Sequence, residues 1–188
     1  EVLDGVVQST VQDAEGMIGY WTVGVPPCGA MDDYNFKIGN MLLGNPKDAA
    51  GLELTLRGGA YRFRCSVSFC ITGADMQATL DGEEIPMYTV TEAKPLQELR
   101  FKTCEKGMRT YLLLAGGIQV PKVMGSCATF CDGKFGGHNG RALRPGDVLH
   151  LGENCTAREE KSFEKEYIPR IDNTSEIGVI PGPQPPGE

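Results

Sequence analysis

The sequence has no run of basic residues, no long apolar stretch and no visible leader. Its 188 residues carry a net charge of −7, which argues against nucleic acid and anionic membrane surfaces as partners. No segment approaches the roughly 20 apolar residues that a membrane-spanning helix needs, so no membrane is expected. A signal peptide is not recognisable, although the chain begins at Glu1, which fits a processed or excised chain.

Histidine is almost absent, because the chain holds His138 and His150 alone. Zinc sites are built from Cys and His at short spacings. Cys65 and Cys70 are five positions apart, which places their side chains on opposite faces of an extended strand. The CxxxC motif at 127–131 has no partner histidine nearby. We therefore expect no metal site.

Two common catalytic signatures are also missing. The segment DGKFGG at 132–137 lacks the Ser or Thr that follows Lys in a phosphate-binding loop, and no strand-to-helix pattern surrounds it. No GxSxG nucleophile elbow occurs. Ser126, His138 and Asp147 are the residue types of a catalytic triad, but such residues are abundant, so a triad is not predicted.

What the chain does contain is typical of one globular domain with a core. Apolar residues make up 40% and charged residues 23% of the sequence. Seven cysteines are many for this length, and an odd number does not suit a disulfide framework. We therefore expect reduced thiols in a cytoplasmic protein, with Cys65 buried on an apolar strand face.

Alternating apolar and polar residues dominate the chain, which is the period of half-buried strands. Glycine pairs at 58–59, 116–117 and 136–137 are typical of tight turns between short strands. In the longest alternating pattern, at 61–72, the odd positions share one apolar face. Further strands are predicted at 52–57, at 76–80 before an Asp81-Gly82 turn, on both sides of Gly107, and at 147–152.

One segment has the spacing of a helix. Asp32 suits the N-cap, and Gly44 and Pro46 end the pattern. We therefore predict an all-β fold with one short α-helix near residues 33–43, an arrangement that favours a closed or nearly closed barrel. The predicted apolar stripe of the helix consists of Tyr34, Ile38, Met41 and Leu42.

The end of the chain has a different composition, first charged and then rich in proline. Residues 176–180 are a candidate for one further strand, with nothing after them to pair with it. We predict a domain at 1–165 and a linker at 166–188 that leads into a second half outside this sequence.

The approach to the helix, IGYWTVGVPPCGAMDD at 18–33, contains the only tryptophan and two adjacent prolines. Two interpretations of Asp32 stay open. Asp32 can cap the helix, or the rigid Pro26-Pro27 segment can hold it at the rim of a pocket. His138 lies in GKFGGHNGR, a Gly-rich loop that can present it to a ligand.

Several segments carry a resemblance in a fixed order. They are EVLDGVVQSTVQD, GYWTVGVPPCGAMDD with GNMLLGN, GLELTLRGGAYRF, ITGADMQATLDG, YLLLAGGIQVPKVMGS, GGHNGRALRPGDVLHLG and EIGVIPGPQ. Together they resemble the allophanate hydrolase subunit 2 family, the carboxyltransferase portion of urea carboxylase (urea amidolyase). Gly19–Trp21 is closer to urea carboxylase, whereas Pro181–Gln184 is more like a related subunit of 5-oxoprolinase. The resemblance implies a cyclophilin-like β-barrel.

The resemblance also implies a reaction, in which CO₂ passes from N1′ of carboxybiotin to a nitrogen of urea or a urea-like amide. Biotin would be carried on a separate domain or protein, ATP would be used only in a partner domain, and this chain would hold no metal. The implied partners are a second barrel, a subunit 1-like domain, a biotin carboxylase and a biotin carrier.

Negative charge that develops on the ureido oxygen calls for fixed N–H donors, which Gly-rich loops supply. Met17 and Cys127 stand where the family commonly has arginine, and Cys28 stands where it has serine, which weakens any anion contact at those positions. The candidate substrate- or biotin-binding residues are Asp32, Gly58, Gly59, Gly116, Gly117, Ser126, His138 and Arg141.

Two alternatives to a urea-directed carboxyltransferase stay open. The chain could be part of an ATP-dependent 5-oxoprolinase, or a non-catalytic regulatory barrel. In each enzymatic case a single barrel offers only one wall of a water-excluding cleft, so we expect the isolated chain to be inactive.

Overall fold

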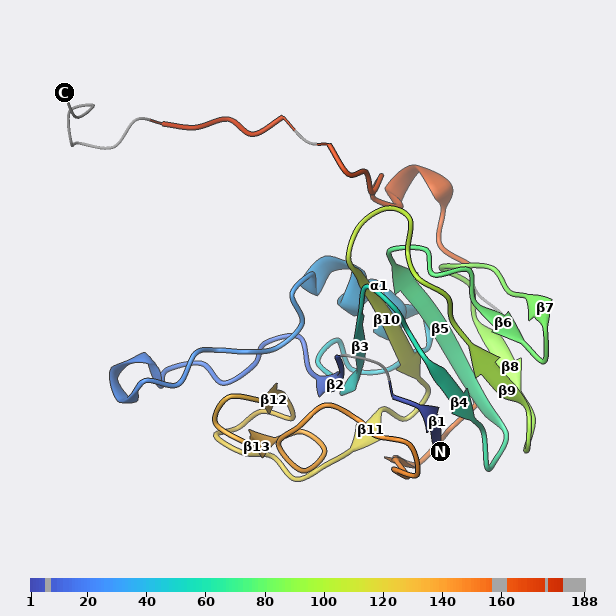
Figure 1. Cartoon of the computed structure of the whole chain (residues 1–188), viewed down its shortest axis with the longest axis horizontal. Helices are drawn as coiled ribbons and strands as arrows, with labels where there is room; N and C mark the ends of the chain where they lie inside the picture. Colours follow the sequence, from blue (N-terminus) through green and yellow to red (C-terminus); the bar gives the residue numbers. More distant parts are fainter. Residues whose placement is uncertain (6–7, 157–161, 175, 181–188) are drawn as a thin grey trace.

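The computed structural model describes residues 1–5, 8–156, 162–174 and 176–180. Two five-stranded antiparallel sheets form the body, and one helix packs against the second sheet (Figure 1). The first sheet has the order β1 (Val2–Asp4), β4 (Ala60–Arg62), β9 (Glu98–Arg100), β6 (Thr79–Leu80) and β7 (Glu83–Glu84). The second has the order β2 (Ser9–Gln12), β3 (Gly51–Thr55), β10 (Arg109–Leu114), β5 (Val67–Gly73) and β8 (Thr91–Ala93).

The remaining elements are short. Helix α1 spans Asp33–Leu42, and the 3-10 helices η1 and η2 span Trp21–Val23 and Lys165–Tyr167. Two small ladders complete the fold: β11 (Ile118–Gln119) pairs with β14 (His150–Leu151), and β12 (Thr129–Phe130) pairs with β13 (Phe135–Gly136).

The main apolar core lies between the two sheets. Within it Phe63, just after β4, stacks on Phe69 of β5 with ring centroids 5.3 Å apart. A second core lies between α1 and the other face of the second sheet, where Phe36 meets Tyr111 edge-on at 5.5 Å. Because β5 has a core on each side, all of its residues are buried.

The predicted all-β class with one short helix is confirmed. The barrel itself is not closed, because in the described parts of the chain no ladder of named strands joins the two sheets. Tight turns carry the chain from one sheet to the other. Leu56 follows β3 with a φ of 62°, and Gly59 precedes β4 with a φ of 77°. Such left-handed positions turn the backbone away from the ladder.

The predicted stripe of α1 is only partly right, because Tyr34 and Met41 are about half exposed. The face toward the sheet centres instead on Gly39, where an added Cβ would lie 2.6 Å from a Leu113 side-chain carbon. The face of α1 that contacts the sheet therefore differs from the predicted apolar stripe. It includes a glycine, where helix and sheet approach closely, and two buried asparagines. The buried residues of α1 are Asn35, Phe36, Ile38, Gly39, Asn40 and Leu42.

The predicted turn at Asp81-Gly82 is confirmed, since both residues have positive φ and join β6 to β7. The prediction that Cys65 is buried is wrong. The alternating pattern at 61–72 is broken, because β4 ends at Arg62 and β5 begins at Val67, and Cys65 lies exposed in the turn between them. All seven cysteines are free thiols.

The candidate strand at 176–180 does not form, since these residues are exposed and irregular. Within the described ranges, no helix combines the length and apolar character needed to cross a bilayer.

The long loop at 16–28, called the arm below, extends away from both sheets (the blue loop in Figure 1). At its base Met17 N donates to Pro27 O at 2.5 Å. Beyond this base Ile18, Trp21 and Val23 are each at least two-thirds exposed. The arm carries no charged residue, so it presents an uncharged surface with large apolar side chains.

Candidate functional site

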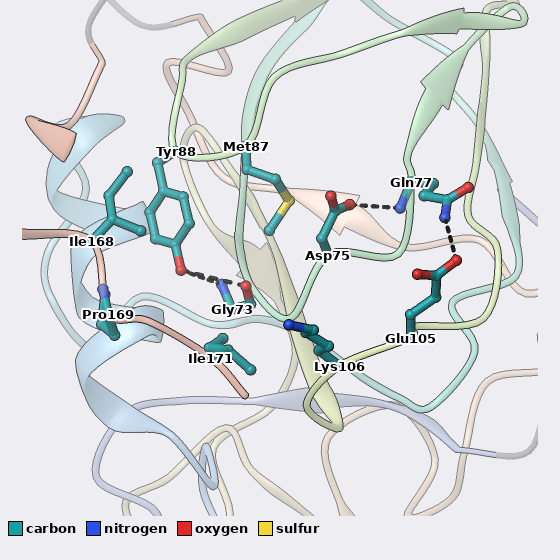
Figure 2. Close-up of a pocket in the computed structure, with 10 residues that line it drawn as sticks. All are labelled: Gly73, Asp75, Gln77, Met87, Tyr88, Glu105, Lys106, Ile168, Pro169 and Ile171. Carbon is teal, nitrogen blue, oxygen red and sulfur yellow. Dashed lines mark hydrogen bonds between the residues drawn. The ribbon is translucent and has the colours of Figure 1, made fainter. Parts of the chain in front are cut away.

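A pocket of about 300 Å³ gathers residues from four separate parts of the chain, three of which supply charged or polar groups (Figure 2). They are the connection after β5, the segment before β8, the turn between β9 and β10, and the C-terminal segment after η2. Loops at the end of a rigid sheet are where proteins commonly place ligand-binding groups. The pocket is lined by Gly73, Asp75, Gln77, Met87, Tyr88, Glu105, Lys106, Ile168, Pro169 and Ile171.

Gln77 connects the acidic groups of this pocket. Its backbone N–H donates to Asp75 Oδ1 at 2.7 Å, and its side-chain amide donates to Glu105 Oε1 at 3.5 Å. Lys102 Nζ in turn donates to the Gln77 side-chain oxygen at 3.0 Å. Gln77 has a φ of 48°, a left-handed conformation that non-glycine residues adopt infrequently. The two carboxylates are thereby fixed as acceptors, and Lys106, whose ammonium group lies 3.5 Å from Asp172 Oδ1, adds a cationic donor.

Tyr88 forms the buried wall of the pocket. Its hydroxyl donates to Asn35 Oδ1 at 2.7 Å and accepts from Gly73 N at 3.0 Å. Burial raises the pKa of Tyr88 to about 12, so the hydroxyl keeps its proton at neutral pH. Asn35 Nδ2 donates to Asp32 Oδ2 at 2.6 Å. Asp32 Oδ1 also accepts from Asn35 N at 3.0 Å, so the predicted N-cap is confirmed, and two hydrogen bonds through Asn35 link it to Tyr88 in the pocket wall.

The same network continues below the helix. Asp32 N donates to the Tyr111 hydroxyl at 2.8 Å, which donates to Glu53 Oε2 at 3.0 Å. Burial and the neighbouring Glu53 carboxylate raise the pKa of Tyr111 far above its usual range. Arg109 Nε lies 3.6 Å from Glu53 Oε1 and has no hydrogen-bond partner in the described structure. A continuous polar chain, buried except at the half-buried Asp32, therefore links the second sheet to the pocket through the start of α1.

The C-terminal segment 162–173 covers one side of the pocket. Phe163 N donates to Tyr88 O at 2.9 Å. Further along, Gly107 N donates to Asn173 Oδ1 at 3.0 Å, and Asn173 Nδ2 donates to Glu105 O at 2.9 Å. These bonds position the apolar residues of the segment beside Tyr88, as Figure 2 shows.

The four glycines of the predicted site lie in tight turns. A Cβ at Gly58 would lie 2.5 Å from Phe101 Cβ, so this position requires the close approach of backbone and ring. Gly116 N donates to Asn45 Oδ1 at 2.9 Å, and both Gly116 and Gly117 have positive φ. The Gly116 N–H is therefore already used inside the fold.

Ser126 contacts Asp13 instead of a histidine. Its hydroxyl lies 2.8 and 3.0 Å from the two Asp13 oxygens, and both residues are buried. Asp13 also accepts from Cys127 N at 2.6 Å and from Gly16 N at 2.8 Å. This cluster fastens the base of the arm to the loop before β12, and Met17 packs beside it as part of a small apolar cluster.

His138 and Arg141 meet at Asp147. Arg141 binds its carboxylate with both terminal nitrogens, at 2.7 and 2.9 Å, and His138 Nε2 lies 3.4 Å from Oδ1. The Arg141 guanidinium holds the pKa of Asp147 far below its usual range. Because Ser126 is bonded to Asp13, the residues Ser126, His138 and Asp147 do not assemble as a triad. Of the eight predicted residues, only His138 and Arg141 share one polar cluster, and Asp32 lies next to the pocket.

Sequence reasoning missed the charged residues of the pocket: Asp75, Glu105 and Lys106. A signal was present in the alternating segment ITGADMQATLDG, where Asp75 and Gln77 are exposed polar positions between buried ones. The charged turn before Gly107 was a second signal. No group of three or more His, Cys, Asp or Glu side chains suited to a metal ion occurs in the part of the chain that the structure describes.

Comparison with known proteins gives a consistent assignment. Residues 23–186 match the family described as carboxyltransferase domain, subdomain A and B. Urea amidolyase of Saccharomyces cerevisiae is 42% identical over 184 residues, which is 93% of this chain but 10% of that protein. A 5-oxoprolinase subunit of Escherichia coli is 35% identical over 98% of this chain, which in turn spans 58% of that relative.

A solved structure shows the same similarity. The crystal structure of the K. lactis urea amidolyase superposes with a TM-score of 0.87 at 35% identity, over 92% of this chain and 11% of that one. The chain is thus much shorter than these relatives. The match to the family over most of the chain leads to one conclusion: this protein belongs to the carboxyltransferase domain family, subdomain A and B.

Proposed function

We propose that this chain is part of a biotin-dependent carboxyltransferase that moves CO₂ from N1′ of carboxybiotin to a nitrogen of urea or a urea-like amide. The observation that carries the proposal is the polarity of the pocket, where the carboxylates of Asp75 and Glu105 lie with the ammonium group of Lys106. Urea-like amides present N–H donors on one side and an acceptor oxygen on the other, which is the complementary arrangement.

In this proposal the carboxylates of Asp75 and Glu105 accept hydrogen bonds from the amide nitrogen and hold it in place. The accepting nitrogen loses one proton as its new bond to carbon forms, and either carboxylate can take that proton. Lys106 donates to an oxygen on which negative charge develops. Such a donor also fits the ureido oxygen of biotin: bound carboxybiotin would supply the carboxyl group as its N1′–carbon bond breaks, and N1′ would take up the proton that the amide nitrogen gives up.

The partners of this function are proposed to be a second barrel, a subunit 1-like domain, a biotin carboxylase that uses ATP, and a biotin carrier. Two observations support further domains. The charged groups Asp75 and Glu105 are exposed, whereas carboxyl transfer needs a cleft that excludes water. The arm also presents Trp21 and Val23 to solvent, and large exposed apolar side chains are typical of contact surfaces. The domain limits 1–165 and 166–188 stay a prediction.

A part in an ATP-dependent 5-oxoprolinase is the second candidate, favoured by the similarity to a 5-oxoprolinase subunit over 98% of this chain. Its substrate is a cyclic amide, so the same acceptor and donor groups would serve. A regulatory barrel without catalysis is the third candidate, and it predicts no effect of pocket substitutions on turnover.

The test is turnover of the full-length protein with urea, guanidine and 5-oxoproline, with and without avidin to block biotin. Avidin-sensitive turnover of urea or guanidine is expected. Asp75→Asn and Glu105→Gln should each lower kcat/KM at least about tenfold, because each removes an acceptor of the substrate N–H groups. Asp48→Asn, a change at an exposed carboxylate outside the pocket, is the matched control. Avidin-insensitive turnover of 5-oxoproline alone would favour the second candidate.

The isolated chain should give no carboxyl transfer from carboxybiotin to urea above the uncatalysed rate. Turnover by this chain that is abolished by Asp75→Asn, His138→Gln or Arg141→Gln would contradict the requirement for a second wall.

A further inference from the structure

A second cavity, of about 380 Å³, lies where the first and second sheets meet the segment around β14. Its lining comes from β3, β5 and β10 of the second sheet, from β4 of the first, and from residues 148–155. It shares no lining residue with the pocket at Tyr88.

The inner walls of this cavity are apolar. The second sheet supplies four buried residues to these walls: Leu52, Val67, Leu112 and Leu114. Phe63 completes the wall, and its ring is held by stacking on Phe69. Burying an alkyl chain here would remove apolar surface from water on both the ligand and the protein.

The mouth of the cavity carries charge. Arg62, Arg64 and His150 line it together with Glu1, whose N-terminal ammonium donates to Arg62 O at 2.9 Å. Arg62 is neutralised by Glu98, with its terminal nitrogen 2.7 Å from Oε1. Arg64 is exposed and makes no ion pair with any residue that the structure describes, so its guanidinium is available to an anion.

We propose that this cavity binds a linear aliphatic monocarboxylate, with its alkyl chain between the leucines and its carboxylate at Arg64. The volume lies within the range of small-molecule sites, and an apolar interior beside the guanidinium of Arg64 matches this class of ligand. A dicarboxylate or a sugar would place polar atoms against Leu112 and Leu114 with no partner, which disfavours both.

The first experiment titrates the 188-residue chain with sodium octanoate, hexanoate, acetate and neutral octan-1-ol, followed by NMR of labelled methyl groups. Shifts are expected at Leu52, Leu112 and Leu114. Each methylene should tighten Kd about threefold to fourfold, so hexanoate should bind about tenfold more weakly than octanoate. Octan-1-ol should bind more weakly than octanoate, because it lacks the anionic head. Equal binding of octanoate and octan-1-ol, or the absence of shifts at these leucines, would overturn the proposal.

A second readout compares a cysteine of the cavity with a cysteine outside it. Cys65 and Cys155 line it, whereas Cys104 lies elsewhere. Octanoate should slow alkylation of Cys65 at least about threefold and leave Cys104 unchanged, since a bound chain blocks access at the mouth. Equal effects on both thiols would indicate a general effect and contradict a bound state at this site.

The head-group contact is tested with Arg64→Gln, which lies on the surface and leaves the core unchanged. This variant should weaken octanoate about tenfold and leave octan-1-ol unaffected. Arg144→Gln is the matched control, because Arg144 is exposed and lies outside the cavity. Similar octanoate affinities of the two variants would show that Arg64 does not hold the carboxylate.

Discussion

The hydroxyl of Ser126 lies 2.8 Å from Oδ2 of Asp13, although 113 positions separate the two residues in the chain. This contact joins the end of β2 to the loop before β12. It also fixes the base of the arm, because the same carboxylate accepts from Gly16 N. A small buried polar cluster therefore decides where a large exposed apolar segment projects.

We predict that Asp13→Ala destabilises the chain by about 2–4 kcal/mol, because it leaves several buried donors without an acceptor. Ser126→Ala should cost less, about 1 kcal/mol, since Asp13 keeps its two backbone donors. Urea unfolding measures both values. A loss for Asp13→Ala no larger than that for Ser126→Ala would contradict the view that the carboxylate organises this cluster.

Asp32→Ala should lower the free energy of unfolding by about 1 kcal/mol through loss of the helix cap. Asp32→Asn keeps an acceptor oxygen and should cost less. Asp33→Asn, on an exposed carboxylate of the first turn, is the control. If Asp32→Ala leaves stability unchanged while turnover of the full-length protein collapses, the cap is not its main role and Asp32 belongs to the site.

Tyr88 should make stability fall at alkaline pH. Its pKa is raised from 10.0 to about 12 by burial, so the unfolded chain loses the proton first. The contribution of Tyr88 is complete below pH 10 and is lost as pH rises toward 12. Tyr88→Phe should flatten this part of the stability profile, while it costs about 1–2 kcal/mol at pH 7 because Gly73 N and Asn35 Oδ1 lose their partner.

Chemical unfolding between about pH 8 and pH 11 gives the measurement, with Tyr34→Phe, at a half-exposed ring, as the control. Equal slopes for Tyr88→Phe and the wild-type chain would exclude Tyr88 as a source of the alkaline loss.

The carboxylate of Asp147 should make the free energy of unfolding fall at acidic pH. Arg141 holds its pKa far below 3.8, so its contribution to stability is present above that value and is lost as pH falls toward the folded-state pKa. Arg141→Gln should cost about 2 kcal/mol at pH 7 and move acid unfolding to higher pH. Arg144→Gln is the control, since the recorded bonds between Arg144 and Asp147 involve only the backbone N–H and C=O of Arg144, not its side chain. Identical acid midpoints for the two variants would refute this account.

The candidate site could be predicted only in part. Asp32 was recognisable because an N-cap is a local feature of the sequence, and Asp75 and Gln77 lie in a segment that stands out by its pattern. Tyr88 and its bond to Asn35 could not be read from the sequence, since 53 positions separate them. Nothing in the local sequence around Ser126 indicated that its partner is Asp13 and not a histidine.

The sequence by itself determined the features that depend on neighbours along the chain. These are the alternating strands, the Asp81-Gly82 turn, and the cap and limits of α1, because backbone preferences and periodicity act over a few residues. Tertiary structure alone decided the open barrel, the exposure of Cys65, and which face of α1 is buried. It also brought Asp75, Tyr88 and Glu105 to one pocket. Each of these depends on contacts between distant segments, whose geometry is set by packing and by buried hydrogen bonds that no local pattern records.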